Sequence, residues 1–377
     1  MAEFESQLLR SFPPIRNGRR HFLQLSAGAF SALMLSNSRR GLSDVQAGNG
    51  GQSGSNLLEI YTWAAYVDDE VIQQFQDQTG IEVRVTLYDS NETMLAKLQA
   101  GGGGNFSIIY PSDYMVQEMI SLDMLAPLDK SRVKGLEDLL PNWANPGYDP
   151  NNGHSVPFAW GTTGLIYNSK QLNPPPEDWA YIWQNKGNLT RQVTLLNDVR
   201  EVMGAALKSL GYSYNSTNQQ EIEAAYQKLV EIRPTLASFT TDAWQDQLLA
   251  GDLAVAMGYS SDAIAVQEDN PDMVYQVPAS GASLWTDTMA ILKTAPNPEA
   301  AYEWINFQLN PENAARNVEK FNFATPVKSA IDLLPAEIKG NADLFPPDDV
   351  LSRCESIAPV GEAVDIYDRY WTLLTSA

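Results

Sequence analysis

A regular alternation of short apolar runs with amphipathic helical segments constrains the fold more than any other feature of this sequence. The first predicted strands cover residues 57–61, 83–88 and 106–110. The helices predicted between them cover residues 68–79 and 92–98. Two neighbouring parallel strands need a long crossover connection, and a helix usually supplies it. The sequence therefore predicts the α/β fold class.

The same alternation continues through the rest of the chain. Further strands are predicted at residues 193–196, 253–257 and 289–292, and further helices at 201–210, 218–231 and 298–309, with a third helical stretch after them to the C-terminus. The length of 377 residues is enough for two domains. Because open α/β sheets bind ligands at the carboxyl ends of their strands, two such domains predict a ligand crevice between them.

Four consecutive glycines, residues 101–104, suggest a phosphate-binding loop at first sight. Such a loop follows a strand and carries a lysine and a hydroxyl side chain. The glycine run follows a predicted helix and has neither residue, so we expect a plain flexible loop without a ligand.

The composition argues against several classes of partner and site. With 46 acidic and 25 basic residues, the chain has a net charge of −21, which repels nucleic acid and attracts cations. Acidity of this kind is also typical of a surface that only keeps an exported protein soluble. The single cysteine, Cys354, excludes an intramolecular disulfide, and the two histidines, His21 and His154, argue against a histidine-based metal site. We expect neither a metal nor a cofactor.

The N-terminal segment has the features of an export signal. Arg19 and Arg20 stand directly before the apolar run of residues 22–35, and this arrangement resembles the twin-arginine signal. The run is too short to span a bilayer but suits a signal peptide. We therefore predict a signal peptide at residues 1–47, a flexible spacer at 48–56 and a periplasmic location. Residues 1–47 carry six arginines and three acids, so the remaining chain has a net charge of −24.

Several short motifs follow one another in an order that resembles one family. They are residues 61–63 with Tyr66, residues 90–94 with 96–98, and residues 111–114, 149–152, 157–161, 197–202, 284–287 and 325–326. Together they resemble the bacterial spermidine/putrescine-binding proteins of polyamine ABC transporters, from about residue 57 to residue 372. The whole set is specific, whereas any one motif is weak.

This resemblance implies a two-lobed periplasmic-binding-protein fold of type II, with the second lobe inserted into the first. The implied boundaries are residues 57–162 plus 286–331 for lobe one and 163–285 plus 332–377 for lobe two. The chain is then expected to be a monomer and no enzyme. It would bind a polyamine, spermidine in preference to putrescine, between the lobes and deliver it to ABC transporter permease subunits.

The resemblance also implies the residues of the site. The aromatic ones are Trp63, Tyr66, Tyr114, Tyr259, Trp285 and Phe323, the carboxylates are Asp198, Glu201 and Asp287, and the hydroxyls are Ser112 and Thr241. These groups suit a polyamine, because aromatic faces cover methylenes and attract cations while carboxylates pair with ammonium groups. Trp160, Trp179, Trp183 and Trp304 have no such support and are expected to pack in the core.

Asp198 and Glu201 allow two interpretations. Three residues apart after an apolar strand, they can face one cleft from the start of a helix. The same spacing is typical of a helix N-cap and its capping-box partner, with no ligand involved.

The chain departs from the family at the first motif, and this leaves the choice of ligand open. Ala64 stands where the family has a hydroxyl and Ala65 where it has an acid. We hypothesise that Asp113, from a neighbouring loop, compensates for the missing carboxylate. Alternatives are a binding protein of the same fold for another small cation, such as thiamine, and an exported hydrolase that uses two carboxylates.

Overall fold

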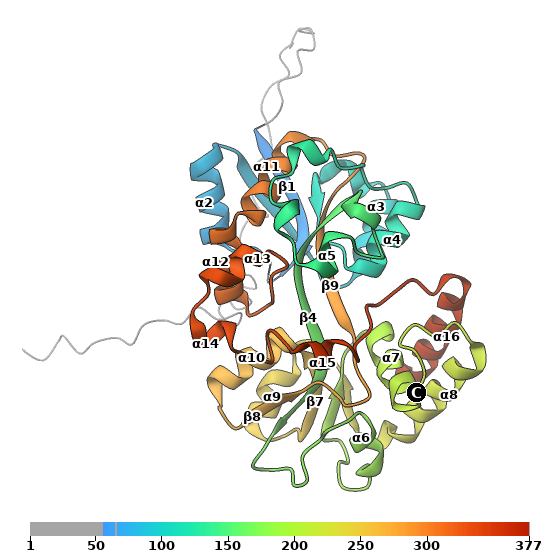
Figure 1. Cartoon of the computed structure of the whole chain (residues 1–377). Coiled ribbons are helices and arrows are strands. Elements are labelled where there is room, and N and C mark those ends of the chain that lie inside the picture. The colour runs from blue at the N-terminus through green and yellow to red at the C-terminus, as the bar shows by residue number, and fades with distance from the viewer. Residues whose placement is uncertain (1–55, 65, 377) are drawn as a thin grey trace, which may run out of the picture. The chain divides into compact units, whose positions relative to one another are not determined.

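A computed structural model describes residues 56–64 and 66–376 of the chain. The predicted signal peptide and almost all of the predicted spacer lie outside the described residues. The described part has two halves, each with its own sheet and helices, which are joined by two long strands (Figure 1). Among the described residues, no helix combines the length and apolar character that crossing a membrane requires.

The sheet of the first half is mixed. Its strands lie in the order β2 (Glu82–Tyr88), β1 (Leu57–Trp63), β3 (Ile108–Ile109), β9 (Leu284–Ile291) and β4 (Ser155–Asn168). β1 pairs in parallel with β2 and β3, whereas β9 runs antiparallel to both of its neighbours. The helices of this half are α2 (Asp69–Thr79), α3 (Asn91–Gln99), α4 (Asp113–Ser121), α5 (Pro141–Ala144), α11 (Pro298–Leu309), α12 (Pro311–Phe321) and α13 (Lys328–Leu333).

The second half continues from the far end of β4. This strand pairs with β7 (Val255–Tyr259) and β8 (Met273–Gln276), and beyond β7 follow β5 (Val193–Leu195) and β6 (Leu236–Phe239). The helices are α6 (Ala180–Gln184), α7 (Val199–Ser209), α8 (Gln219–Glu231), α9 (Trp244–Ala250), α10 (Ser260–Asp269) and α16 (Val364–Thr375). Two short helices, α14 (Ala336–Lys339) and α15 (Asp348–Leu351), lie on the segment before α16.

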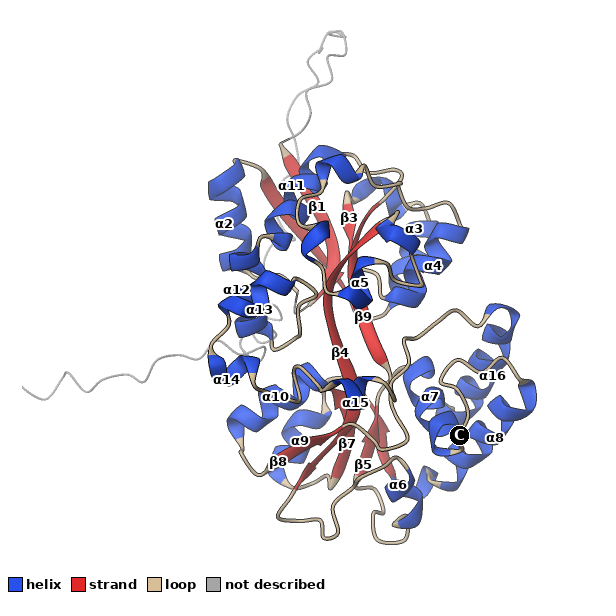
Figure 2. Ribbon diagram, viewed as in Figure 1, coloured by secondary structure: helices blue, strands red, loops and turns tan. Residues whose placement is uncertain are grey.

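β4 belongs to both sheets. Its residues 155–162 pair with β9, and its residues 163–167 pair with β7 (Figure 2). β9 pairs with β4 where β4 passes from the first half to the second, so these two strands connect the halves. Buried side chains fill one core in the second half and two in the first half, one on each face of its sheet.

The sequence predictions are confirmed for the α/β class and the two-lobed fold, and several details differ. The glycine run forms a 3₁₀-helix, Gly102–Asn105, after Gly101 takes a left-handed φ of 98°, so the prediction of a plain loop was wrong. The predicted strand 106–110 has only two residues, Ile108–Ile109. Beyond its end, the Tyr110 carbonyl accepts bonds from Trp63 Nε1 and the Tyr88 hydroxyl. The predicted strand 289–292 begins earlier, at Leu284.

The tryptophans that were predicted to pack in the core do so. Trp160, Trp179, Trp183 and Trp304 are all buried. Their indole N–H groups each donate a hydrogen bond, for example from Trp179 to the carbonyl of Gly281 at 2.8 Å. The lobe boundaries themselves stay a prediction.

Candidate functional site

The predicted site residues come from turns at the ends of strands and from β9. Trp63 ends β1 and Tyr66 follows it, Ser112 to Tyr114 follow β3, and Trp285 and Asp287 lie on β9 itself. From the second half, Asp198 and Glu201 follow β5, Thr241 follows β6 and Tyr259 ends β7. Because most of these strands end at the same edge of their sheets, the fold gathers their turns around the crossing strands.

Asp287 is a buried carboxylate with two hydroxyl donors. The hydroxyl of Ser112 donates to Oδ1 and that of Tyr66 donates to Oδ2, and the side chain is 8% exposed. Burial raises the pKa of Asp287 to about 6. The two hydroxyl bonds favour the charged form but do not offset the loss of water. Asp287 therefore attracts either a proton or a cation at neutral pH.

Glu201 is held by three hydroxyl side chains. Thr163 donates to Oε1 at 3.1 Å, Tyr214 donates to Oε2 at 2.7 Å, and Ser283 lies 2.9 Å from both oxygens. Burial and then the charge of Asp198 raise the pKa of Glu201 to about 7. Its carboxylate points to these hydroxyls, so Glu201 does not form the capping box that the sequence allowed.

Asp198 is the N-cap of α7. Its Oδ1 accepts the backbone N–H groups of Arg200 at 2.8 Å and Glu201 at 3.0 Å. Burial raises its pKa, although these two bonds favour the charged form. The structure thus confirms the N-cap interpretation, and the cap leaves the second carboxylate oxygen available.

Asp198 faces groups from the first half. Burial and then the charge of Asp198 raise the pKa of Glu92 on α3. The hydroxyl of Tyr114 donates to Glu92 at 3.0 Å, and the guanidinium of Arg200 lies 6.0 Å from the Tyr114 ring. The starts of α3, α4 and α7 therefore meet at this side of the site.

Two aromatic rings of the predicted site contact each other. Tyr259 and Trp285 meet edge to face at 5.9 Å, and the N–H of Trp285 has no acceptor among the described residues. Burial raises the pKa of Tyr259. The charges of Asp198, Glu201 and Asp287 raise it further, so all three carboxylates act on the same ring.

Trp63 is fixed by its own contacts. Its indole N–H donates to the carbonyl of Tyr110 at 2.9 Å, and its ring lies 4.5 Å from that of Tyr88. The side chain is only half-buried. Its exposed surface is thus held in one orientation.

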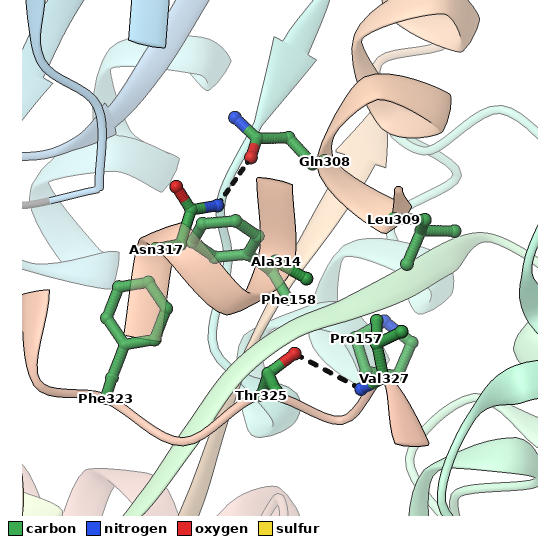
Figure 3. Close-up of a pocket in the computed structure, with 9 residues that line it drawn as sticks. All are labelled: Pro157, Phe158, Gln308, Leu309, Ala314, Asn317, Phe323, Thr325 and Val327. Carbon is green, nitrogen blue, oxygen red and sulfur yellow. Dashed lines mark hydrogen bonds between the residues drawn. The ribbon is translucent and has the colours of Figure 1, made fainter. Parts of the chain in front are cut away.

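Two predicted site residues, Phe323 and Thr241, do not present an open surface to a ligand. Phe323 is 2% exposed, and its ring lies 5.3 Å from that of Tyr66. Its ring also lies 5.3 Å from that of Phe158, which lines the same small pocket (Figure 3). The space that it lines has essentially no free volume, about 0 Å³, so Phe323 supports Tyr66 from behind. Thr241 is half-buried, and its carbonyl accepts a bond from Trp244 Nε1 at 2.9 Å.

The residues that orient the carboxylates were not predicted from the sequence. Glu92 lies inside a recognised motif, but nothing in the pattern shows that its side chain reaches Tyr114. Thr163, Tyr214 and Ser283 have no local signal, because they lie 38, 13 and 82 residues from Glu201 in the chain. Only the tertiary fold brings them to one carboxylate.

A cavity of about 490 Å³ borders this site. Its lining residues come from the first half, from β9 and from the loop 356–358 of the second half. Thr286 lines the cavity from β9, on the face of the strand opposite to that of its neighbour Asp287. Arg200 donates to the carbonyl of Ala358 at 2.8 Å and so links it to the start of α7.

The amino-acid sequence is similar to those of known proteins over most of the chain. The family model of bacterial extracellular solute-binding proteins matches residues 70–346. A spermidine/putrescine-binding periplasmic protein of Salmonella typhimurium is 35% identical over 323 residues, which are 85% of this chain and 92% of that protein. A putrescine/cadaverine-binding protein of Pseudomonas aeruginosa is 31% identical, over 83% of this chain and 91% of that protein.

A solved structure agrees with the fold. A spermidine/putrescine ABC transporter protein from Listeria monocytogenes superimposes with a TM-score of 0.80 at 37% identity, and the match covers 85% of this chain and 99% of that one.

Proposed function

This chain belongs to the bacterial extracellular solute-binding protein family, and from this premise we propose that it is the extracytoplasmic substrate-binding component of a polyamine ABC importer. The observation that supports the proposal is a set of three buried carboxylates, Asp198, Glu201 and Asp287, whose charges all raise the pKa of Tyr259. A flexible chain of methylenes with several ammonium groups has the complementary chemistry.

The buried carboxylates supply the attraction for the ligand. Burial raises the pKa values of Asp287 and Glu201, and no basic side chain of the described residues lowers either value. An ammonium group supplies that charge and donates up to three hydrogen bonds. The exposed faces of Trp63 and Tyr259 would cover the methylenes between the ammonium groups, each cation–π contact contributing about 0.5–2 kcal/mol.

Ligand binding would stabilise one arrangement of the two lobes. Trp63, Tyr114 and Asp287 come from the first half or the crossing strand, and Asp198 and Glu201 come from the second. A ligand that contacts both sets shifts the population toward a closed form, because only that form offers all the contacts. We propose that the closed form docks on the permease subunits and that the protein acts as a monomer.

We favour spermidine over putrescine as the ligand. Relatives named for spermidine, putrescine and cadaverine are all similar to this chain, so similarity alone does not rank these amines. The site has more than two buried carboxylates, including Asp113, and a triamine can use a third one. Relatives named periplasmic support a location outside the cytoplasm. Export by the twin-arginine route stays a prediction from residues 1–47.

Thermal melting with added amines tests the proposal. A ligand that binds only the native state stabilises it, by about 2.7 kcal/mol at 100 times its dissociation constant. We expect spermidine and putrescine to raise the melting temperature, whereas thiamine, butylamine and a salt control of equal ionic strength do not. If neither polyamine shifts the transition, or if thiamine shifts it more, the proposed function is wrong.

A further inference from the structure

Asn91, the first residue of α3, is a buried polar residue to which the site described so far gives no role. Its side chain is 5% exposed. It does not cap its own helix, because the preceding Ser90 does so by accepting the backbone N–H of Thr93 at 3.1 Å. The amide of Asn91 is therefore buried for a reason other than the start of α3.

The contacts of Asn91 determine how its amide is oriented. The backbone N–H of Ser112 faces one end of the amide at 3.2 Å, and a backbone N–H can only donate, so that end is the oxygen Oδ1. The other end is then Nδ2, whose two N–H groups donate to the hydroxyl oxygens of Ser112 at 2.9 Å and Tyr114 at 3.1 Å. Two of the three bonds of Asn91 thus end on hydroxyl groups.

These two bonds limit where each hydroxyl can send its own proton. A hydroxyl has one proton, and an oxygen that accepts an N–H cannot donate back to the same nitrogen. The proton of Ser112 accordingly lies toward Oδ1 of Asp287. That of Tyr114 lies toward Oε1 of Glu92, at 3.0 Å. One amide thereby directs a proton to a carboxylate on β9 and another to a carboxylate on α3.

Ser112 shows that its hydroxyl serves Asp287 and not its own helix. It is the N-cap of α4, a position where a serine side chain usually accepts a backbone N–H of the first turn. Its side chain makes no such capping bond. The hydroxyl bonds with Asn91 and Asp287 instead, so the direction of its proton belongs to the site.

We propose that Asn91 is a positioning residue for polyamine binding: its amide makes two hydroxyl groups donate to two carboxylates and so favours the charged form of both. The inference rests on the proposed function and deepens it. A carboxylate that receives a hydroxyl bond keeps its charge for an ammonium group. A hydroxyl that turned away would place its oxygen against the carboxylate oxygen, and the protonated acid would then compete with the ligand.

Asn91→Asp tests the proposal, because it separates the direction of the protons from the net charge. The new carboxylate has almost the same size but no N–H group, so both hydroxyls would donate to it and turn away from Asp287 and Glu92. An effect of net charge alone would strengthen spermidine binding. We expect the opposite, a loss of at least fivefold in calorimetry at pH 8. Gln99→Glu is the matched control, since it adds the same charge at an exposed position at the other end of α3, and it is expected to change affinity less than twofold.

Asn91→Ala distinguishes a positioning role from a structural one. It removes the amide without adding an acceptor, so the two hydroxyls are no longer held but can still donate to the carboxylates. The expected order of spermidine affinity is wild type, then Asn91→Ala, then Asn91→Asp. A purely structural role predicts the reverse order for the two variants, because alanine loses more contacts than the isosteric aspartate. Melting of the ligand-free variants checks that each is folded.

Removing the two hydroxyls completes the test. In the Ser112→Ala/Tyr114→Phe background Asn91 has no proton to direct, so adding Asn91→Asp or Asn91→Ala is expected to lower spermidine affinity less than twofold. The same loss as in the wild-type background would overturn the proposal, and so would wild-type or higher affinity of Asn91→Asp alone. If wild-type protein binds neither spermidine nor putrescine, the proposed function fails instead.

Discussion

The two carboxylates nearest the crossing strands differ in how many of their oxygen lone pairs are already used. Glu201 receives bonds from three hydroxyls, with Ser283 close to both oxygens. Asp287 receives one hydroxyl bond at each oxygen. A carboxylate has about four acceptor positions, so Asp287 keeps more capacity for a ligand.

Asp287→Asn is therefore expected to have a large effect on binding. The amide keeps the size of the side chain and one acceptor oxygen, but it removes the charge that pairs with an ammonium group. We expect a loss of about 2–5 kcal/mol in polyamine binding free energy, measured by calorimetry, with the ligand-free protein still folded. Wild-type affinity in this variant would place the ligand elsewhere.

Glu92 is predicted to contribute at the opposite side of the site. It accepts the Tyr114 hydroxyl and lies in the field of Asp198, so a cation bound there interacts with both carboxylates. We expect Glu92→Gln to weaken spermidine binding several-fold in equilibrium titrations. The control is Asp89→Asn, which removes an exposed charge from the preceding turn and is expected to have little effect. An equal loss of spermidine affinity in both variants would mean that only the net negative charge of this surface matters, not the position of Glu92.

At the scale of the helix, one residue of α7, Asp198, combines a structural role with a proposed binding role. Asp198 caps the helix through Oδ1, while its negative charge faces Glu92 and Tyr114. Asp198 can therefore be both a helix N-cap and a carboxylate that faces the cleft, the two interpretations that its sequence position allows.

Two substitutions at Asp198 separate these roles. Asparagine also caps helices, so Asp198→Asn is expected to keep the free energy of unfolding within about 0.5 kcal/mol while polyamine affinity falls. Asp198→Ala loses the cap as well and is expected to lower stability by about 0.5–2 kcal/mol. Urea denaturation and calorimetry on both variants measure the two effects. Equal stability of the two variants would show that the cap contributes nothing.

The packing of α7 also positions Glu201. A Cβ at Gly204 would lie 2.0 Å from the Tyr214 ring, whose hydroxyl donates to Glu201 at 2.7 Å. Gly204→Ala is expected to displace Tyr214, to destabilise the protein by about 1–3 kcal/mol and to weaken polyamine binding. Gly187→Ala is the control, because a Cβ at that position would have no neighbouring atom within 4 Å. Unchanged melting and affinity in Gly204→Ala would contradict this role of Tyr214.

At the scale of the whole molecule, the raised carboxylate pKa values make binding and stability depend on pH. Polyamines pair with the ionised carboxylates, so protons compete with them below about pH 7 for Glu201 and below about pH 6 for Asp287. We expect affinity to fall as the pH is lowered through this range. Binding at pH 6–7 should release protons, which calorimetry in buffers of different ionisation heat detects. Constant affinity between pH 5.5 and pH 8 would contradict the assignment.

The ligand-free protein should show the opposite trend in stability. Both carboxylates have a higher pKa in the folded protein than the ordinary values of 4.5 and 3.8, so the folded state binds more protons than the unfolded state. Their contribution to the free energy of unfolding is therefore present at low pH. It is lost as the pH rises from about 4 to about 7, by about 1.4 kcal/mol for each unit by which the pKa is raised. Melting in this range, with and without spermidine, measures the contribution.

The sequence predicted much of this fold, and the exceptions have physical causes. Helix α11 has the predicted bounds, 298–309, because Asn297 caps it and Pro298 starts it. β4 was not predicted, because Pro157, Gly161 and Gly164 interrupt the pattern of a strand. The carboxylates Asp198 and Glu201 were predicted as site residues from the motif at residues 197–202 that resembles the family. Their hydroxyl donors could not be found, since these come from distant parts of the chain.

The place of β9 in the first sheet affects how the protein can be made. β9 lies between β3 and β4, although residues 169–283 separate β4 from β9 in the chain. Until the ribosome has added residue 291, the first sheet has a gap and lacks both Trp285 and Asp287. Neither half is one continuous stretch, so neither can be produced alone by simple truncation. Biosynthesis thus completes the first sheet and adds two of the proposed binding residues in the same step.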